Sequence, residues 1–149
     1  MSEHTAYEDG GGFTVRRRLP GTPERVRAAF TEPERLEQWF VVEGYRTPAA
    51  RMRVDARTGG RFDAVMVSET DGTEIPFGFD YVEVEPLRVV LAFTEPRERV
   101  TVTLAPVEGG TDLTYEFRSW PPPSDPAASR RGVEDMLDRI DAGLRAGTI

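Results

Sequence analysis

Apolar positions along the chain repeat about every 3.6 residues in some segments and every second residue in others, so the pattern itself indicates helices and strands. Residues 13–19 open with alternating apolar and polar side chains, which predicts a first strand. Two short helices follow, one beginning at Thr22-Pro23 and one at Pro33, because threonine caps a helix start and proline fits the first turn. The sequence therefore predicts a strand followed by two helices.

From Tyr45 onward the apolar spacing changes to two residues, which is typical of strands with one buried face. Asp71-Gly72 between two such runs predicts a hairpin turn. The expected strands lie near residues 52–54, 62–67, 75–81, 89–93, 100–104 and 113–117. Short turns between six consecutive strands predict an antiparallel meander with one apolar face.

The last periodic segment, residues 127–146, has helical spacing and a length of roughly 30 Å, enough to cross a sheet. Its apolar stripe consists of Val133, Met136, Leu137, Ile140 and Leu144. The whole order, β-α-α-β-β-β-β-β-β-α, predicts an α+β fold in which a curved sheet wraps the long C-terminal helix and the two short helices close one end. We expect residues 1–12 to form a disordered tail and residues 13–149 a single domain.

Composition and charge exclude several partners. With 149 residues, 38% of them hydrophobic, the chain suits one domain with one core. The formal net charge of −7 argues against binding nucleic acid, and no apolar run is long enough for membrane insertion. Because the chain has no cysteine and no segment of the signal-peptide type, we expect a cytoplasmic protein.

The missing residue types exclude several chemistries as well. All 19 basic residues are arginine, there is no lysine, and the single histidine, His4, falls in the expected tail. Schiff-base, thiolate and histidine-relay catalysis therefore lack their essential groups. We expect no metal site, no cofactor and no catalytic residue of these kinds.

Five sequence motifs carry a family resemblance: PERVRAAFTEPERLEQWF, TGGRF, DGTEIPF, YVEVEP and MLDRI. Their order and spacing, from about Phe13 to Leu144, resemble the activator of heat-shock-protein-90 ATPase homologue family within the START-like (SRPBCC, helix-grip) superfamily. The resemblance implies a helix-grip fold with an apolar cavity between sheet and helix. The chain departs from the family at Phe79, where many members have glycine, and at Gly132-Val133, where many have tryptophan after the glycine, so the shape of the cavity differs.

This resemblance implies that the adjacent rings of Trp39 and Phe40 have different surroundings, since neighbouring helical residues point about 100° apart. We expect Phe40 to pack inward and Trp39 to lie at the mouth of the cavity. The expected ligand-binding residues are Trp39, Phe40, Phe62, Met66, Phe77, Phe79, Tyr81, Phe93, Tyr115, Phe117, Val133, Met136 and Ile140. The alternative is that these side chains simply fill the core.

Few polar groups accompany these side chains. Tyr81 and Tyr115 are the expected polar anchors, because a buried phenol needs a partner. Glu83 would share a face with Tyr81 if the strand is regular. We interpret the charged motifs VEVEP and RERV as solvated strand edges, and the arginines at 16–18 as partners of local acids.

Three functions remain open at this point. The first is binding of a small apolar or aromatic molecule in the cavity. The second is an enzyme resembling polyketide aromatases and cyclases, in which Tyr81 and Glu83 would move protons. The third is a chaperone partner, as the family name suggests, although we expect no extra N-terminal domain of the kind associated with chaperone activation.

Overall fold

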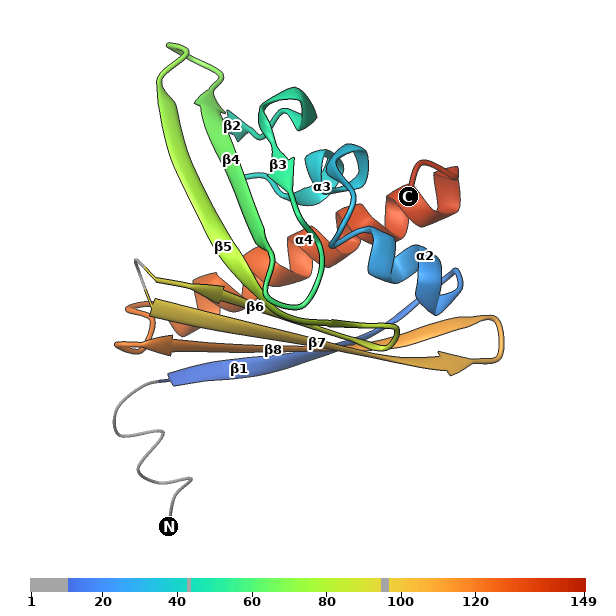
Figure 1. The fold of residues 1–149 in the computed structure, drawn as a ribbon. Helices are drawn as coiled ribbons and strands as arrows, with labels where there is room; N and C mark the ends of the chain where they lie inside the picture. Colours follow the sequence, from blue (N-terminus) through green and yellow to red (C-terminus); the bar gives the residue numbers. More distant parts are fainter. Residues whose placement is uncertain (1–10, 43, 95–96) are drawn as a thin grey trace.

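The computed structural model describes residues 11–42, 44–94 and 97–149, and it places a long helix in the concave side of a bent antiparallel sheet (Figure 1). The elements in chain order are β1 (Gly11–Leu19), α2 (Pro23–Ala28), α3 (Pro33–Trp39), β2 (Tyr45–Arg46), the 3₁₀ turn η1 (Ala49–Arg51), β3 (Arg53–Val54), β4 (Arg61–Ser68), β5 (Glu74–Glu85), β6 (Arg88–Phe93), β7 (Arg97–Val107), β8 (Gly110–Trp120) and α4 (Pro126–Ala146).

The sheet runs in the order β1-β8-β7-β6-β5-β4-β2, with β3 also paired to β4. Consecutive strands from β4 to β8 are antiparallel neighbours, and the first strand closes the series by pairing with the last. Strands β4 and β5 rise steeply away from β1, β7 and β8, and α4 lies in the angle between the two parts (Figure 1). The predicted α+β helix-grip architecture is confirmed.

Local signals in the sequence act as expected. The Thr22 side chain accepts a hydrogen bond from the main-chain N–H of Arg25 and so caps α2, and proline opens α2, α3 and α4. In the turn between β4 and β5, Asp71 accepts a hydrogen bond from the N–H of Thr73 and Gly72 takes a φ of 75°, a conformation that favours glycine.

The boundaries differ from expectation in two places. Strand β1 begins at Gly11, where it pairs with Ser119, so two glycines assigned to the tail belong to the sheet. Residues 1–10, which include His4, lie outside the described residues. A two-residue strand, β2, pairs with the end of β4 and was not predicted.

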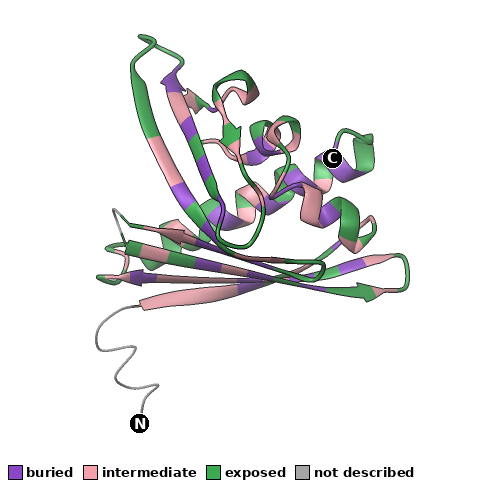
Figure 2. Cartoon of the chain, in the orientation of Figure 1, coloured by how far each residue is buried: buried purple, intermediate pink, exposed green. Residues whose placement is uncertain are grey.

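The core lies between the concave face of the sheet and one side of α4 (Figure 2). Leu137, Ile140 and Leu144 of the predicted helix stripe are at most 4% exposed. Val133 is also buried, whereas Met136 is only partly buried. The same helix therefore packs more completely toward its C-terminal end.

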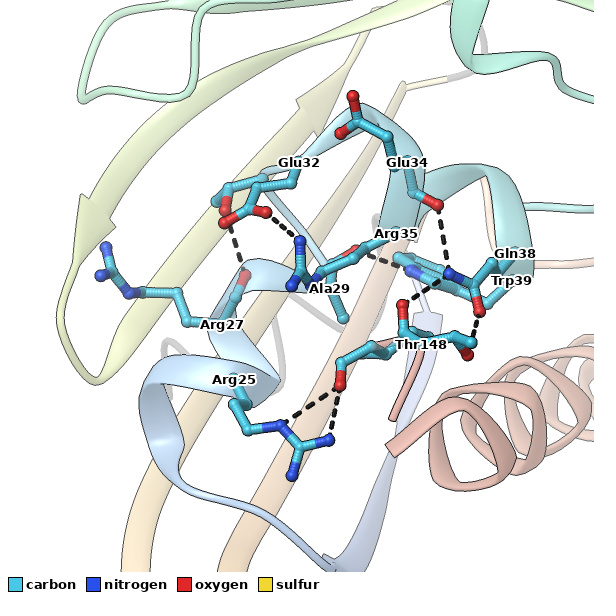
Figure 3. A network of polar contacts seen from close by, with 11 residues as sticks. Arg25, Arg27, Ala29, Glu32, Glu34, Arg35, Gln38, Trp39 and Thr148 are labelled. Carbon is cyan, nitrogen blue, oxygen red and sulfur yellow. Dashed lines mark hydrogen bonds and ion pairs between the residues drawn. The ribbon is translucent and has the colours of Figure 1, made fainter. Parts of the chain in front are cut away.

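Polar contacts fasten that end of α4 to the two short helices (Figure 3). The Arg25 guanidinium on α2 donates to the main-chain oxygens of Leu144, at 2.9 Å, and Ile149, at 2.6 Å. On α3, the Gln38 side chain donates to the main-chain oxygen of Thr148 at 2.7 Å and accepts from the Thr148 hydroxyl at 2.8 Å. These contacts hold α2, α3 and the C-terminal end of α4 together.

The chain after α4 folds back over the helix. Gly147 has a φ of 78°, and the N–H groups of Thr148 and Ile149 both donate to the carbonyl oxygen of Gly143. The Ile149 side chain, 2% exposed, occupies the space left by the absent side chain of Gly143.

Candidate ligand-binding groove

A groove of about 860 Å³ opens between the concave face of the sheet and the N-terminal half of α4. Four phenylalanine rings line it together with residues of α4 and of the segment that follows α3. The lining residues are Phe13, Phe40, Val41, Val42, Phe93, Glu98, Val100, Tyr115, Phe117, Ala128, Ser129, Arg131, Gly132, Val133, Asp135, Met136 and Arg139. We refer to this space as the groove.

The sheet contributes an aromatic wall, because alternate side chains of neighbouring strands share its concave face. Phe13 on β1 pairs in register with Phe117 on β8, and their rings stack with centroids 5.1 Å apart. Phe93 on β6 and Val100 on β7 extend the same face. The rings of Phe13, Phe93 and Phe117 are all partly exposed, so part of each ring surface is open to a ligand.

The helix contributes small residues where it faces this wall. Ala128, Ser129 and Gly132 lie along the groove, and a methyl group added at Gly132 would meet no atom within 4 Å. Val133 and Met136 contribute the apolar side chains on the same stretch of α4. Sheet and helix therefore do not fill the space between them at this end.

The two adjacent rings after α3 take the reverse of their expected positions. Trp39 is 3% exposed, and its indole N–H donates to the carbonyl oxygen of Ala29 at 2.6 Å. The expectation of Trp39 at the mouth is therefore wrong, and Phe40 lines the groove instead. The buried indole finds a partner on the segment after α2, a contact that the helical spacing alone could not reveal.

Phe40 also joins the groove to a packed aromatic cluster. Its ring lies 5.3 Å from that of Phe77 and 5.9 Å from that of Phe62, centroid to centroid. Phe62 and Phe79 stack nearly parallel at 4.4 Å, and Phe79 contacts Phe93 at 5.2 Å. The ring of Phe79 therefore helps to fill this end of the space.

The thirteen expected ligand-binding residues fall into two groups. The groove brings together six of them: Phe40, Phe93, Tyr115, Phe117, Val133 and Met136. The other seven are outside its lining: Trp39, Phe62, Met66, Phe77, Phe79, Tyr81 and Ile140. Four of the seven, Phe62, Phe79, Tyr81 and Ile140, are at most 1% exposed and belong to the core, as the packing alternative supposed.

The two residues considered for proton transfer do not form a site. The Tyr81 hydroxyl donates to the carbonyl oxygen of Phe30 at 2.8 Å, and burial raises its pKa. A bulge follows Tyr81 in β5: Tyr81 pairs with Leu91, but Glu83 pairs with Val90. The extra residue shifts the alternation by one, so Val84 lies on the same face of the sheet as Tyr81 and Glu83 lies on the opposite face. Glu83 forms an ion pair with Arg88, with 3.1 Å between Oε2 and Nε.

The structure identifies an acidic residue that the sequence analysis assigned to a solvated edge. Glu98 lies opposite Phe93 and Ser119 in the sheet and lines the groove. Burial raises the pKa of its carboxyl group. The two-residue spacing of Glu98, Val100 and Val102 indicates that Glu98 shares their apolar face. The arginines on either side of Glu98 favoured the interpretation as a solvated strand edge instead.

Tyr115, one of the two expected polar anchors, lines the groove. It is 7% exposed, and its pKa is raised by burial and, to a smaller extent, by the negative charge of Glu98. Tyr115 and Glu98 thus place a phenol and a carboxyl group on one apolar wall. Such a pair can orient a ligand by hydrogen bonds or charge.

Two of the three arginines of β1, Arg17 and Arg18, pair with local acids as expected. Arg17 pairs with Asp138 of α4 at 2.8 Å, and Arg18 pairs with Asp112 of β8 at 3.1 Å.

Within residues 11–42, 44–94 and 97–149, no three histidine or acidic side chains cluster closely enough to hold a metal ion. Among the helices of the same ranges, none is both long and apolar enough to span a membrane.

Comparison with known protein families matches most of the chain. A sequence model of the family described as "Activator of Hsp90 ATPase homolog 1-like protein" matches residues 20–145. No functionally curated protein matches the chain.

Solved structures of bacterial proteins share the fold. Protein CV1439 from Chromobacterium violaceum is 28% identical, with a TM-score of 0.77 over 89% of this chain and 96% of that one. The AHSA1-like protein from Aeromonas hydrophila is 23% identical, with a TM-score of 0.76 over 93% of this chain and 96% of that one. SA2116 from Staphylococcus aureus, a protein of unknown function, has a TM-score of 0.77 at 19% identity over 93% and 96% of the two chains. At the identities of the latter two, the likeness concerns the fold alone.

Proposed function

The chain belongs to the activator of Hsp90 ATPase homolog 1-like family, and from that premise we propose that it binds a small, largely apolar or aromatic molecule in the groove. Proteins of this START-like fold family commonly bind hydrophobic ligands. The ligand would lie between the N-terminal half of α4 and the side of the sheet that faces it.

The observation that carries the proposal is the unfilled space itself. A volume of about 860 Å³ falls in the range of small-molecule sites, and the groove combines a mostly apolar sheet side with charged groups of Arg131, Asp135 and Arg139 on the helix side. At this end sheet and helix leave a space that solvent and a ligand can enter, instead of closing a core between them.

The lining favours a flat or flexible apolar body. Phe93, Phe117 and Phe13 offer ring surfaces on the sheet side, where an aromatic ligand can stack or make edge contacts. Met136 faces them from the helix, and its unbranched thioether adapts to different shapes. Binding would bury these partly exposed side chains and so gain hydrophobic free energy.

A substitution that fills the groove tests the proposal. In Gly132→Trp the new Cβ would meet no atom within 4 Å, and the indole would be added at a residue that lines the groove. Ala142→Trp is the matched control, because it adds the same side chain to an exposed position of the same helix. The neutral fluorophore N-phenyl-1-naphthylamine serves as the probe, since its emission rises when it leaves water.

We expect saturable, one-to-one binding of this probe to the wild type and to Ala142→Trp, and a loss of at least about tenfold in affinity for Gly132→Trp. Circular dichroism and thermal melting check that both variants are folded. Equal binding by the two variants, or no saturable binding by the wild type, would contradict the proposal.

The family description supports a second candidate, contact with the Hsp90 chaperone. Its test is direct: the purified chain is mixed with the chaperone, and complex formation and ATPase rate are measured. A complex at tens of micromolar together with a faster ATPase would support this role. Absence of both would exclude it without affecting the groove.

A further inference from the structure

Among the residues that the structure describes, the carboxylate of Glu98 is the one acidic group that the sheet places on the aromatic wall of the groove. Strand β7 presents Glu98, Val100 and Val102 on its concave face, since alternate residues share a face. Directly opposite, β6 presents Phe93. The carboxylate therefore projects beside a partly exposed ring instead of into solvent at a strand edge.

Several other acids of the sheet have a cationic partner, whereas no described arginine pairs with Glu98. Glu74 pairs with Arg51 at 3.0 Å, and Asp80 pairs with Arg61 at 3.1 Å. Among the described residues, none forms an ion pair or hydrogen bond with the Glu98 carboxylate. Burial without a partner disfavours the charged form, which is why its pKa is raised.

A partly desolvated carboxylate on an aromatic wall has the features of a site for an organic cation. An ammonium group placed there would form a charge-assisted hydrogen bond with the carboxylate. The faces of nearby Phe93 and Phe117 would add cation–π attraction. The remaining apolar part of the ligand would lie along Val133 and Met136.

We propose that the groove selects ligands that carry a positively charged amine on an apolar or aromatic body, with Glu98 as the residue that determines this specificity. This inference rests on the proposed function, because it concerns the ligand of the same groove. Tyr115, on the neighbouring strand, would orient the ligand beside Glu98 without providing charge.

The arginines of the groove do not offer an equivalent site for an anion. Arg131 and Arg139 belong to α4, where they lie on the exposed rim and not on the recessed wall. Asp135, between them in the same helix, also lines the groove and offsets part of their charge. Because exposed charges are screened by solvent and salt, the recessed carboxylate should dominate selection.

Three probes with one aromatic body and different charges test this inference: 2-naphthylmethylamine, a cation at neutral pH, 2-naphthalenemethanol, which is neutral, and 2-naphthoate, an anion. Their affinities are measured by titration calorimetry for the wild type, Glu98→Gln and Glu108→Gln. Glu98→Gln keeps the shape of the side chain and removes its charge. Glu108→Gln makes the same change at an exposed position in the β7–β8 turn.

We expect the wild type and Glu108→Gln to bind the amine about tenfold more tightly than the alcohol, and the acid more weakly than either. In Glu98→Gln the preference for the amine should disappear, while affinity for the alcohol changes less than about twofold. Affinity for the alcohol without a preference for the amine, a preference retained in Glu98→Gln, or a preference for the acid would overturn the inference and leave the groove proposal intact. Failure of all three probes to bind would overturn both.

Discussion

The two halves of α4 face the same sheet but make different contacts with it. Toward the C-terminal end, Leu137, Ile140 and Leu144 are at most 4% exposed, and the end of the helix is fastened to α2 and α3. Toward the N-terminal end, small residues such as Gly132 and the partly buried Met136 border the groove. The C-terminal half of α4 packs into the core, and the N-terminal half forms one side of the groove.

This difference shows how a single helix can supply both stability and a binding surface. Free energy of folding comes mainly from the half where apolar side chains are fully buried. The other half can leave its partners partly exposed because the first half already fixes the helix on the sheet. Substitutions at matched positions in the two halves should therefore have different effects.

The largest difference should appear when a large apolar side chain is shortened. Ile140→Ala removes a side chain that is 0% exposed and should lower the free energy of unfolding by about 3 kcal/mol. Met136→Ala acts on a groove-lining, partly buried residue and should cost less than about 1 kcal/mol, since little new cavity forms. Urea denaturation of both variants measures the difference. Equal costs would mean that the groove is packed in solution.

The two glycines of α4 allow a sharper comparison, because the same substitution to alanine should change the stability of the protein in opposite directions at the two positions. In Gly143→Ala the new Cβ would lie 2.6 Å from Cγ1 and Cδ1 of Ile149, so Ile149 must move and stability should fall by about 1–3 kcal/mol. In Gly132→Ala the Cβ meets open space, and the higher helix propensity of alanine should raise stability by up to about 1 kcal/mol. Thermal melting provides the readout, and shifts of the same sign would contradict the description of the two halves.

Two buried tyrosines extend the comparison to the sheet. Tyr81→Phe removes the 2.8 Å hydrogen bond to the carbonyl oxygen of Phe30 and should cost about 1–2 kcal/mol. Tyr115 lines the groove, and its hydroxyl forms no hydrogen bond with a described residue, so Tyr115→Phe should change stability by less than about 0.5 kcal/mol. Ligand affinity should show the reverse order. A larger stability loss for Tyr115→Phe would place its hydroxyl in the packed core.

Much of the fold could be predicted because its signals are local. The spacing of apolar residues reports which face of each element is buried, and Thr22 and Asp71-Gly72 mark a helix start and a turn by their own hydrogen-bonding chemistry. The order of the elements then left one economical arrangement. For these features, neighbours along the chain carry the information.

The details of the groove depend on contacts between distant segments. The helical spacing shows that Trp39 and Phe40 point apart, but only the Ala29 carbonyl and the ring of Phe77 decide which one is buried. Similarly, the turn before β4 bonds to β5 on both sides of the bulge, through Gly59 N–H to Tyr81 O at 2.8 Å and Val84 N–H to the Thr58 hydroxyl at 3.0 Å. No local pattern in β5 announces this irregularity.

The smallest expected effect on stability comes from Glu98. For this residue the spacing of apolar positions indicated the concave face of the sheet, whereas its charge favoured a solvated edge. Because burial raises the pKa of this carboxyl in the folded protein, the folded state binds more protons than the unfolded state between the two pKa values. Stability should therefore decrease as pH rises through this window, and the penalty should be fully present above the folded pKa. The charged or titratable groups that line the same groove are Tyr115 of β8 and Arg131, Asp135 and Arg139 of α4.

Glu98→Gln removes this penalty, so the variant should melt about 1–2 °C higher than the wild type at neutral pH, a small shift because the group is only partly buried. The difference should shrink as pH falls toward the ordinary glutamate pKa of about 4.3 and vanish below about pH 3, where the carboxyl is protonated in both states. Glu108→Gln, at an exposed site, should show no such gain. A wild type that is more stable than Glu98→Gln at neutral pH would mean that the protein itself supplies a partner for the carboxylate. A gain confined to neutral pH would instead indicate that the sheet keeps a destabilising charge, as expected where a ligand provides the partner.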